Sequence, residues 1–262
     1  MSGDLFQHFP AEEKNFVEQV LDWQGQVLDQ YRPILSDFLD PREQVIAQTV
    51  LGKSHSDYRY AFWGGYDQAE RQRLFIYPPY LEAEEGDYDL VLVEISYAKK
   101  FNQLSHRQVL GSLLGQGLER KVLGDILSDG ERWQFISSQE LLPFFIQEVD
   151  RVGRAKVELQ PVPWSDRVQS QENWQERTIS AASLRLDLVL AEALNLSRTK
   201  AKSLVQAKAI KQNWQVQDRV DREVAVGDTL SVRGYGRLYI DQILGQSKKG
   251  KVRLAIQYLA NQ

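Results

Sequence analysis

Residues 183–205 read SLRLDLVLAEALNLSRTKAKSLV, and residues 227–237 read GDTLSVRGYGR. In the first stretch, apolar residues recur at three- and four-residue spacings, which is typical of a helix that buries one face. The second stretch belongs to a short tail rich in strand-forming residues. Together they predict a pair of helices that runs into a small β-sheet. The inward positions of the first helix are Leu186, Leu190 and Ala193.

Polar residues mark where the two helices begin. Ser183 is placed to cap the first helix, since serine side chains accept hydrogen bonds from the free amides of a first turn. Asn195 and Leu196 interrupt the pattern, and Ser197 is placed to cap a second helix. The inward stripe of that second helix is Ala201, Leu204 and Val205.

The basic residues of the chain are concentrated in the same region. The whole chain has 32 Lys and Arg against 36 Asp and Glu, a formal net charge of −4. Residues 183–262 contain 14 basic and 7 acidic residues, so they carry +7 and the first 182 residues carry −11. Such an asymmetry indicates that the basic side contacts nucleic acid or a membrane surface.

Three cations of the second helix point to an anion outside the fold. Arg198 and Lys202 are four residues apart and share a helix face, while Lys200 lies across the helix. Arg198 and Lys200 occupy the first turn, where the helix dipole disfavours positive charge. We therefore expect these side chains to bind phosphate rather than to stabilise the helix.

The skeleton of this region resembles the S4 RNA-binding domain. The matching residues run over Arg185-Leu186-Asp187, Leu196-Ser197-Arg198, Gly227-Asp228 and the segment 231–237. The resemblance implies two helices packed on a small sheet, with the helical face and its adjoining loop contacting structured RNA. The expected RNA contacts are Arg185, Ser197, Arg198, Lys200, Lys202, Lys208, Lys211, Arg233 and Arg237.

One turn departs from the S4 pattern. The family usually has Asn-Gly where this chain has Asn213-Trp214, and tryptophan tolerates a positive φ poorly. We therefore expect this hairpin to be built differently. Trp214 either stacks on a base or packs against the preceding linker, and the sequence leaves both interpretations open.

The remaining periodicities predict an α+β protein of three domains. Residues 1–80 form a helical or mixed domain, helical over 10–53 with Asp40 as an N-cap and with strands at 60–63 and 73–77. Residues 81–165 predict strands at 90–97, 122–127, 133–137 and 156–162 and helices at 106–114 and 139–149, the order of a ferredoxin-like split βαβ unit. A polar linker over 166–182 and the S4-like domain over 183–262 follow.

The middle segments resemble those of the YlmH-like family of bacterial S4-domain RNA-binding proteins. The match includes His106-Arg107-x-Val109-Leu110-Gly111, Gly117-Leu118-x-Arg120 and Leu123-Gly124-Asp125-Ile126, and the resemblance extends over nearly the whole chain. It implies binding to the large ribosomal subunit, through rRNA and tRNA, in handling stalled translation complexes. Arg107 and Arg120 are candidates for a secondary RNA contact. Trp133 and Phe135 lie on the same face of a predicted strand, and the sequence leaves open whether they belong to the core or point outward to stack on bases.

Other classes of protein are less well supported. The chain has no cysteine and only three histidines, so we expect no metal site. It also lacks a glycine-rich loop of the kind that binds phosphate, so we expect no cofactor. An RNA-modifying enzyme, of the pseudouridine synthase or methyltransferase type, is one alternative to a non-catalytic RNA-binding protein. A protein-binding scaffold linked to cell division is the other. Without a signal sequence or an apolar run long enough to span a bilayer, we expect a cytoplasmic monomer.

Overall fold

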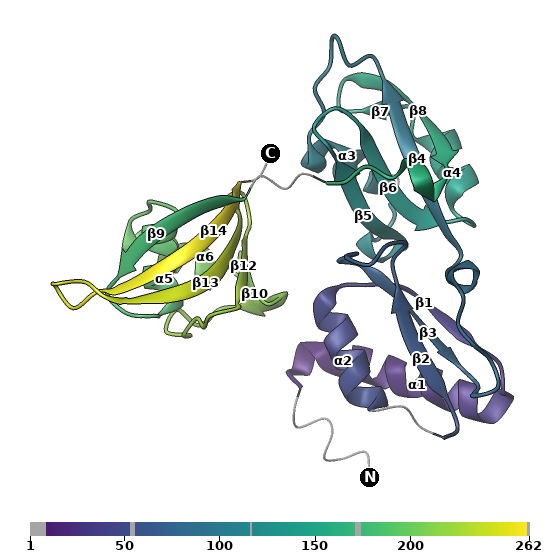
Figure 1. Ribbon diagram of the computed structural model, residues 1–262, viewed down its shortest axis with the longest axis horizontal. Coiled ribbons are helices and arrows are strands. Elements are labelled where there is room, and N and C mark those ends of the chain that lie inside the picture. The colour runs from purple at the N-terminus through teal and green to yellow at the C-terminus, as the bar shows by residue number, and fades with distance from the viewer. Residues whose placement is uncertain (1–8, 53–55, 116, 171–173, 261–262) are drawn as a thin grey trace. The chain divides into compact units, whose positions relative to one another are not determined.

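The computed structural model describes residues 9–52, 56–115, 117–170 and 174–260. The chain divides into two units, Met1–Gln171 and Glu172–Gln262, hereafter unit 1 and unit 2 (Figure 1). The two front domains expected from the sequence share a core inside unit 1. Phe38 and Phe75 of the first pack with Leu92 and Ile136 of the second. The exact three-domain boundaries stay a prediction.

The N-terminal part of unit 1 packs two helices on a small antiparallel sheet. Helices α1 (Lys14–Gln30) and α2 (Pro41–Leu51) contact a sheet with the strand order β1 (Ile34–Leu39), β3 (Gln72–Tyr77) and β2 (Arg59–Trp63). Their shared core includes buried side chains from all these layers, among them Val20, Val27, Ala47, Leu51, Leu74 and Ile76.

The prediction that residues 10–53 are helical was wrong between the two helices, where the strand β1 lies. Tyr31 ends α1 in the left-handed conformation with a φ of 52°, and Pro33 disfavours helical geometry at the residue before it. Asp40 caps α2 as predicted, since its carboxylate accepts from the amides of Arg42 and Glu43 at 2.9 and 3.0 Å. The Glu43 side chain accepts from the Asp40 amide in return, at 2.7 Å.

The second part of unit 1 has the strand order of a ferredoxin-like sheet with one added strand. The order is β5 (Leu123–Ser128), β6 (Trp133–Ser138), β4 (Leu90–Tyr97), β8 (Ala155–Val162) and the short β7 (Arg151–Val152). Helices α3 (His106–Leu114) and α4 (Leu142–Glu148) connect its strands. The predicted order of elements is confirmed, although α4 begins three residues later than expected, at a turn that places Pro143 in its first positions.

Both faces of this sheet are covered where β4 begins. Val93, Phe135 and Trp133 lie in the core shared with α3 and α4, which settles Trp133 and Phe135 as core residues. The opposite face, with Leu90 and Leu92, packs on the N-terminal part of unit 1. The alternation of side chains along a strand accounts for this division.

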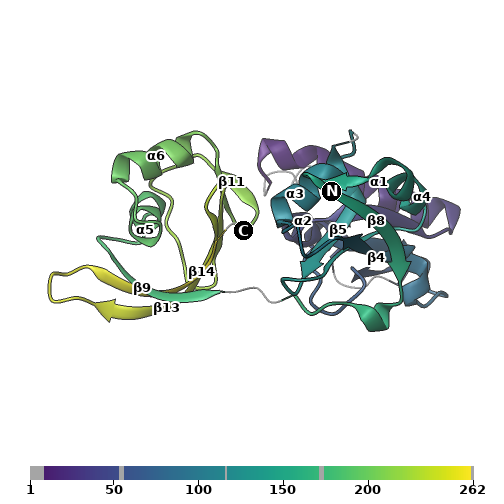
Figure 2. The ribbon, with the colours of Figure 1, turned by 90° about the horizontal axis from the view of Figure 1, so that it is seen from above.

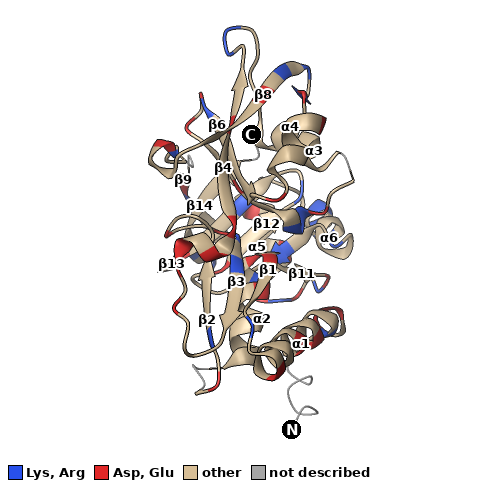
Figure 3. Cartoon of the chain, turned by 90° about the vertical axis from the view of Figure 1, so that its right-hand side faces the viewer, with Lys and Arg blue, Asp and Glu red and all other residues tan. Residues whose placement is uncertain are grey.

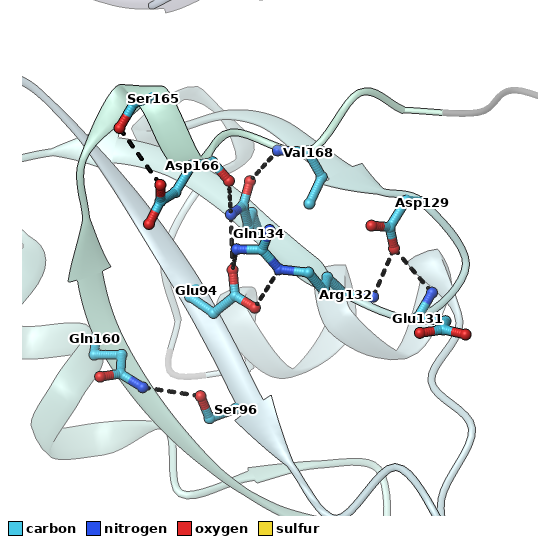
Figure 4. Close-up of polar contacts among 10 residues, drawn as sticks. All are labelled: Glu94, Ser96, Asp129, Glu131, Arg132, Gln134, Gln160, Ser165, Asp166 and Val168. Atoms are coloured by element: carbon cyan, nitrogen blue, oxygen red, sulfur yellow. Dashed lines mark hydrogen bonds and ion pairs between the residues drawn. The ribbon is translucent and has the colours of Figure 1, made fainter.

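A segment after β8 also covers the second face and is fastened by Gln134 (Figure 4). The fully buried Gln134 amide donates to the Asp166 carbonyl at 3.0 Å and accepts from the Val168 amide at 2.8 Å. Its nitrogen also donates to Glu94, whose carboxylate binds Arg132 through two hydrogen bonds of 3.0 and 2.7 Å. The segment 164–168 is therefore held as a strap on unit 1.

Unit 2 packs two helices on a six-stranded antiparallel sheet. The strand order is β11 (Gln215–Gln217), β10 (Ile210–Gln212), β12 (Thr229–Val232), β13 (Gly236–Gln246), β14 (Val252–Ala260) and β9 (Gln175–Ala181). Helices α5 (Leu186–Ala193) and α6 (Arg198–Gln206) lie on one side of this sheet, as Figure 2 shows. Their core joins Leu186, Leu190, Ala201 and Val205 to Leu230, Leu238, Leu254 and Ile256.

Unit 2 differs from the sequence predictions at two places. The polar stretch expected as a linker contains the edge strand β9, whose Ile179 and Ala181 are buried; residues 171–173 of that stretch lie outside the described residues. The helix expected to be capped by Ser183 instead begins at Leu186, with Arg185 at the N-cap position.

The hairpin between β10 and β11 was also predicted incorrectly. Asn213 and Trp214 both have positive φ, 50° and 64°, so the pair occupies the turn that the family pattern gives to Asn-Gly. Asn213 is held there because its side chain donates to Asp228 at 2.7 Å and accepts from the Thr229 amide at 2.9 Å. These bonds impose on Trp214 a conformation that its own preference disfavours.

Within the described residues, no helix has the length and apolar character required to cross a bilayer.

Asp125 of β5 joins the two parts of unit 1, and this contact can be tested. Its carboxylate accepts from the Tyr66 hydroxyl at 2.8 Å and from the amides of Glu70 and Arg71 at 2.7 and 3.1 Å. We expect Asp125→Ala to lower the free energy of unfolding by about 2 kcal/mol, because three donors lose their acceptor. Urea unfolding of the full chain measures this. Asp67 is exposed, so Asp67→Ala serves as the control. Equal effects of the two substitutions would contradict the role of Asp125 in joining the two parts of unit 1.

Candidate nucleic-acid interface

The start of α6 presents a cluster of cations because its other face is buried. Ser197 caps the helix as predicted, with its hydroxyl accepting from the Lys200 amide at 3.2 Å. Ala201 and Val205 are completely buried, so the helix turns these residues to the sheet and leaves its other side outward. Arg198 and Lys200 are exposed there, and Lys202 is partly buried.

A buried carboxylate holds the two arginines of the site. Asp187 is inaccessible to solvent, and its oxygens accept from Arg185 Nε at 3.1 Å and from Arg198 Nε at 3.2 Å. Burial alone would raise the pKa of Asp187, but the hydrogen bonds and charges of Arg185 and Arg198 together outweigh it and lower that pKa. Arg198 remains 54% exposed and Arg185 35% exposed, so each guanidinium keeps a surface available for another anion.

This arrangement has a chemical consequence. Two guanidinium groups share one carboxylate, which leaves one positive charge in excess and orients both planar groups before any ligand arrives. Guanidinium groups bind phosphate through paired hydrogen bonds, and prior orientation reduces the entropy lost on binding. In the described part of the chain, Lys200 and Lys202 contact no carboxylate and add unneutralised charge beside the pair.

The other predicted contacts of unit 2 form separate groups. The Arg233 amide donates to the Ala209 carbonyl at 2.9 Å, which brings Arg233 close to Lys208. The Lys208 ammonium lies 4.0 Å from the Asp218 carboxylate. Lys211 and Arg237 are both opposite Ser231 in the strand register. They therefore share the face of the sheet that points away from α5 and α6, since their neighbours Ile210, Leu230 and Leu238 lie in the helix-side core.

The two predicted contacts of unit 1 differ from each other. Arg107 is exposed on α3. The Arg120 guanidinium donates to the carbonyls of Leu123 at 2.6 Å and of Gly124 at 3.0 Å. Arg120 therefore fixes the backbone that enters β5, and Arg107 is better placed for a ligand.

The sequence interpretation missed a cationic arm. The hairpin between β13 and β14 continues beyond the end of β9, whose Ala181 pairs with Val252 (Figure 1). Its exposed tip carries Lys248, Lys249 and Lys251, and Ile243 and Leu244 beside it are 45% and 40% exposed. The run Lys-Lys-Gly-Lys was a signal that could have identified the tip.

Comparisons with known proteins agree on one family. A family model described as "Putative RNA-binding domain in YlmH" matches residues 83–166, and one described as "YlmH, N-terminal" matches residues 12–81. The chain is 40% identical over 255 residues to the Ribosome-associated protein quality control protein P2 of Bacillus subtilis (strain 168), covering 97% of this chain and 98% of that relative. The solved structure of the cell division protein ylmH from Streptococcus pneumoniae is 29% identical, with a TM-score of 0.55, and covers 62% of this chain and 98% of its own.

The Asp187 pair makes a prediction about stability and pH. We expect Asp187→Asn to lower the free energy of unfolding at neutral pH by about 2 kcal/mol, because hydrogen bonds to a charged acceptor are lost. Since the folded pKa of Asp187 lies below its ordinary value, its contribution is complete above about pH 4 and disappears as the pH falls through the folded pKa.

Urea unfolding of wild type and Asp187→Asn at neutral and acidic pH measures both statements. The exposed Asp241→Asn removes a carboxylate from the same unit and is the matched control. A difference between wild type and Asp187→Asn that stays constant from neutral to acidic pH would show that the ion pairs do not carry the effect.

Proposed function

The chain belongs to the YlmH family, and on that basis we propose that it is a non-catalytic, ribosome-associated RNA-binding protein whose unit 2 is an S4 domain. The family model described as an RNA-binding domain, which matches residues 83–166 of unit 1, and the relative named a ribosome-associated quality control protein support the RNA-binding and ribosomal parts of this proposal. The S4 part rests on the sequence resemblance of unit 2 and on its two helices packed on a sheet. The finer proposal is that it binds the large ribosomal subunit through rRNA and tRNA and acts on stalled or obstructed translation complexes.

The observation that carries the proposal is the Arg185–Asp187–Arg198 cluster beside Lys200 and Lys202. Its cations arise from the starts of both helices of unit 2 and are fixed by one buried carboxylate. The exposed first-turn amides of α6 add attraction for phosphate. Such a rigid cationic surface recognises the shape and backbone of folded RNA, with phosphate contacts providing affinity.

The acidic composition of the rest of the chain supports selectivity. Residues 1–182 carry a net charge of −11, which repels a polyanion from most of their surface. RNA is therefore guided to the basic regions rather than bound over the whole molecule. We propose Arg185, Arg198, Lys200 and Lys202 as the principal contacts, with Lys208, Lys211, Arg233 and Arg237 as further ones on other faces of unit 2.

The salt dependence of RNA binding tests the electrostatic part. We expect Lys200→Gln/Lys202→Gln to weaken binding to a structured rRNA fragment and to reduce the slope of log affinity against log salt by roughly 1–2, one per lost phosphate contact. Both lysines lie outside the Asp187 pair, so the fold is retained. Lys14→Gln/Arg59→Gln neutralises two exposed cations of unit 1 and should leave the slope unchanged. An unchanged slope in the Lys200/Lys202 variant would contradict the site.

Sedimentation of the full chain with bacterial ribosomes tests the partner. We expect wild type to co-migrate with the large subunit at low salt and to dissociate as salt rises, because phosphate contacts are screened. The Lys200→Gln/Lys202→Gln variant should dissociate at lower salt, and Lys14→Gln/Arg59→Gln should follow wild type. Wild type that stays at the top of the gradient at every salt concentration would contradict ribosome association.

A further inference from the structure

A loop of unit 1 holds an aromatic ring in solvent. Phe101, between β4 and α3, is 81% exposed, the highest value among the large apolar side chains of the described residues. The loop is ordered by hydrogen bonds, since the Ala98 carbonyl accepts from the Phe101 amide and from the Asn102 side chain, each at 3.1 Å. The Lys100 ammonium lies 5.8 Å from the centre of the Phe101 ring.

Other cations lie around this loop because of strand pairing and helix packing. Tyr97, at the end of β4, pairs with Val157 of β8, so Lys156 lies beside the point where the loop leaves the sheet. Gly153 donates its amide to Ser112 of α3 at 3.4 Å, which brings the β7–β8 turn against that helix. The exposed cations of these segments are Lys99, Lys100, Arg107, Arg151, Arg154 and Lys156.

These six cations, hereafter the loop-end patch, are arranged at a cost to stability. Arg151 and Lys156 are directly opposite in the β7–β8 register, and like charges opposite each other destabilise a strand pair. Segments 98–108 and 150–157 hold these six cations and a single acid, a net of +5. The net charge of residues 1–171 is −10, so unit 1 without these two segments has a net charge of −15. Positive charge is concentrated here in a strongly acidic unit, as the blue segments near the top of Figure 3 show.

The sheet itself leaves little room for RNA. Many split βαβ domains bind unpaired nucleotides on the open face of the sheet, through aromatic side chains of the central strands. Here Trp133 and Phe135 lie in the helix-side core, and the other face is covered by the N-terminal part and by the strap 164–168. An RNA contact of this unit has to use a loop or an edge.

We propose that the loop-end patch is a second RNA-binding surface, in which an unpaired base stacks on Phe101 and its flanking phosphates bind Lys99, Lys100 and the neighbouring cations. An aromatic ring between cations is the arrangement that binds single-stranded nucleic acid, by stacking and by charge. A protein partner is a poorer match, since charged residues are depleted at the core of protein interfaces and these segments hold six cations against one acid. The inference rests on the proposed function in that the partner is RNA, but it concerns a different unit and a different RNA form.

Binding of two RNAs to the full chain tests this surface. One is a short, labelled, unpaired oligoribonucleotide, and the other is a fully paired RNA duplex. We expect Phe101→Ala to weaken binding of the unpaired RNA about tenfold, because one base loses its stacking partner. Phe101→Trp should retain binding of the unpaired RNA, and binding of the duplex should not change in either variant. Tyr80→Ala removes another exposed aromatic side chain of unit 1, 68% exposed, and should behave as wild type.

Each other outcome identifies what has failed. If Phe101→Ala binds the unpaired RNA as wild type does, the second surface is overturned, while binding of the duplex still supports the proposed function. If the Phe101→Ala variant binds free unpaired RNA normally but no longer co-migrates with ribosomes, the loop contacts protein and the inference is also overturned. If wild type binds neither RNA, the proposed function and this inference both fail. Because Phe101 is exposed, thermal unfolding of the variant should match wild type.

Discussion

A carboxylate without solvent access is the constraint on which the organisation of unit 2 depends. An ionised group that loses its hydration must gain charged partners, and Asp187 obtains two guanidinium groups from the starts of different helices. This requirement fixes α5 relative to α6 and determines where two of the cations can lie. Arg185 and Arg198 thus stabilise the fold, and in the function we propose they also bind an external anion, because each guanidinium remains partly exposed beside Asp187.

Unit 1 is governed by a different constraint, the covering of a sheet on two faces. The alternation along β4 sends Val93 toward α3 and α4 and Leu92 toward Phe38 and Phe75. Gln134, which is uncharged and fully buried, satisfies the backbone of the strap through both ends of its amide. A face that is filled in this way is a structural element rather than a ligand surface, which is why we propose a loop of this unit as its RNA contact.

Local patterns were sufficient to predict much of this fold. The spacing of apolar residues located α3, and the Asp40–Pro41 signal located the start of α2, since both depend on interactions within a few residues. Strands β1 and β9 were missed because their burial depends on partners far along the chain, Ile76 for β1 and Leu254 for β9. The positive φ of Trp214 was also out of reach, because Asp228 and Thr229 impose it through Asn213.

For the candidate site, too, local sequence was informative and long-range contacts were not predictable. The sequence located the surplus of cations, but charge alone does not show which cations are already engaged. Arg120 binds two backbone carbonyls, and Lys211 and Arg237 lie on the opposite side of the sheet from the α6 cluster. The α6 cluster lies in unit 2 and the loop-end patch lies in unit 1, so one chain carries both basic regions. If both bind one RNA as we propose, two weak contacts tethered in one chain bind far more tightly than either alone, provided that the linker permits both.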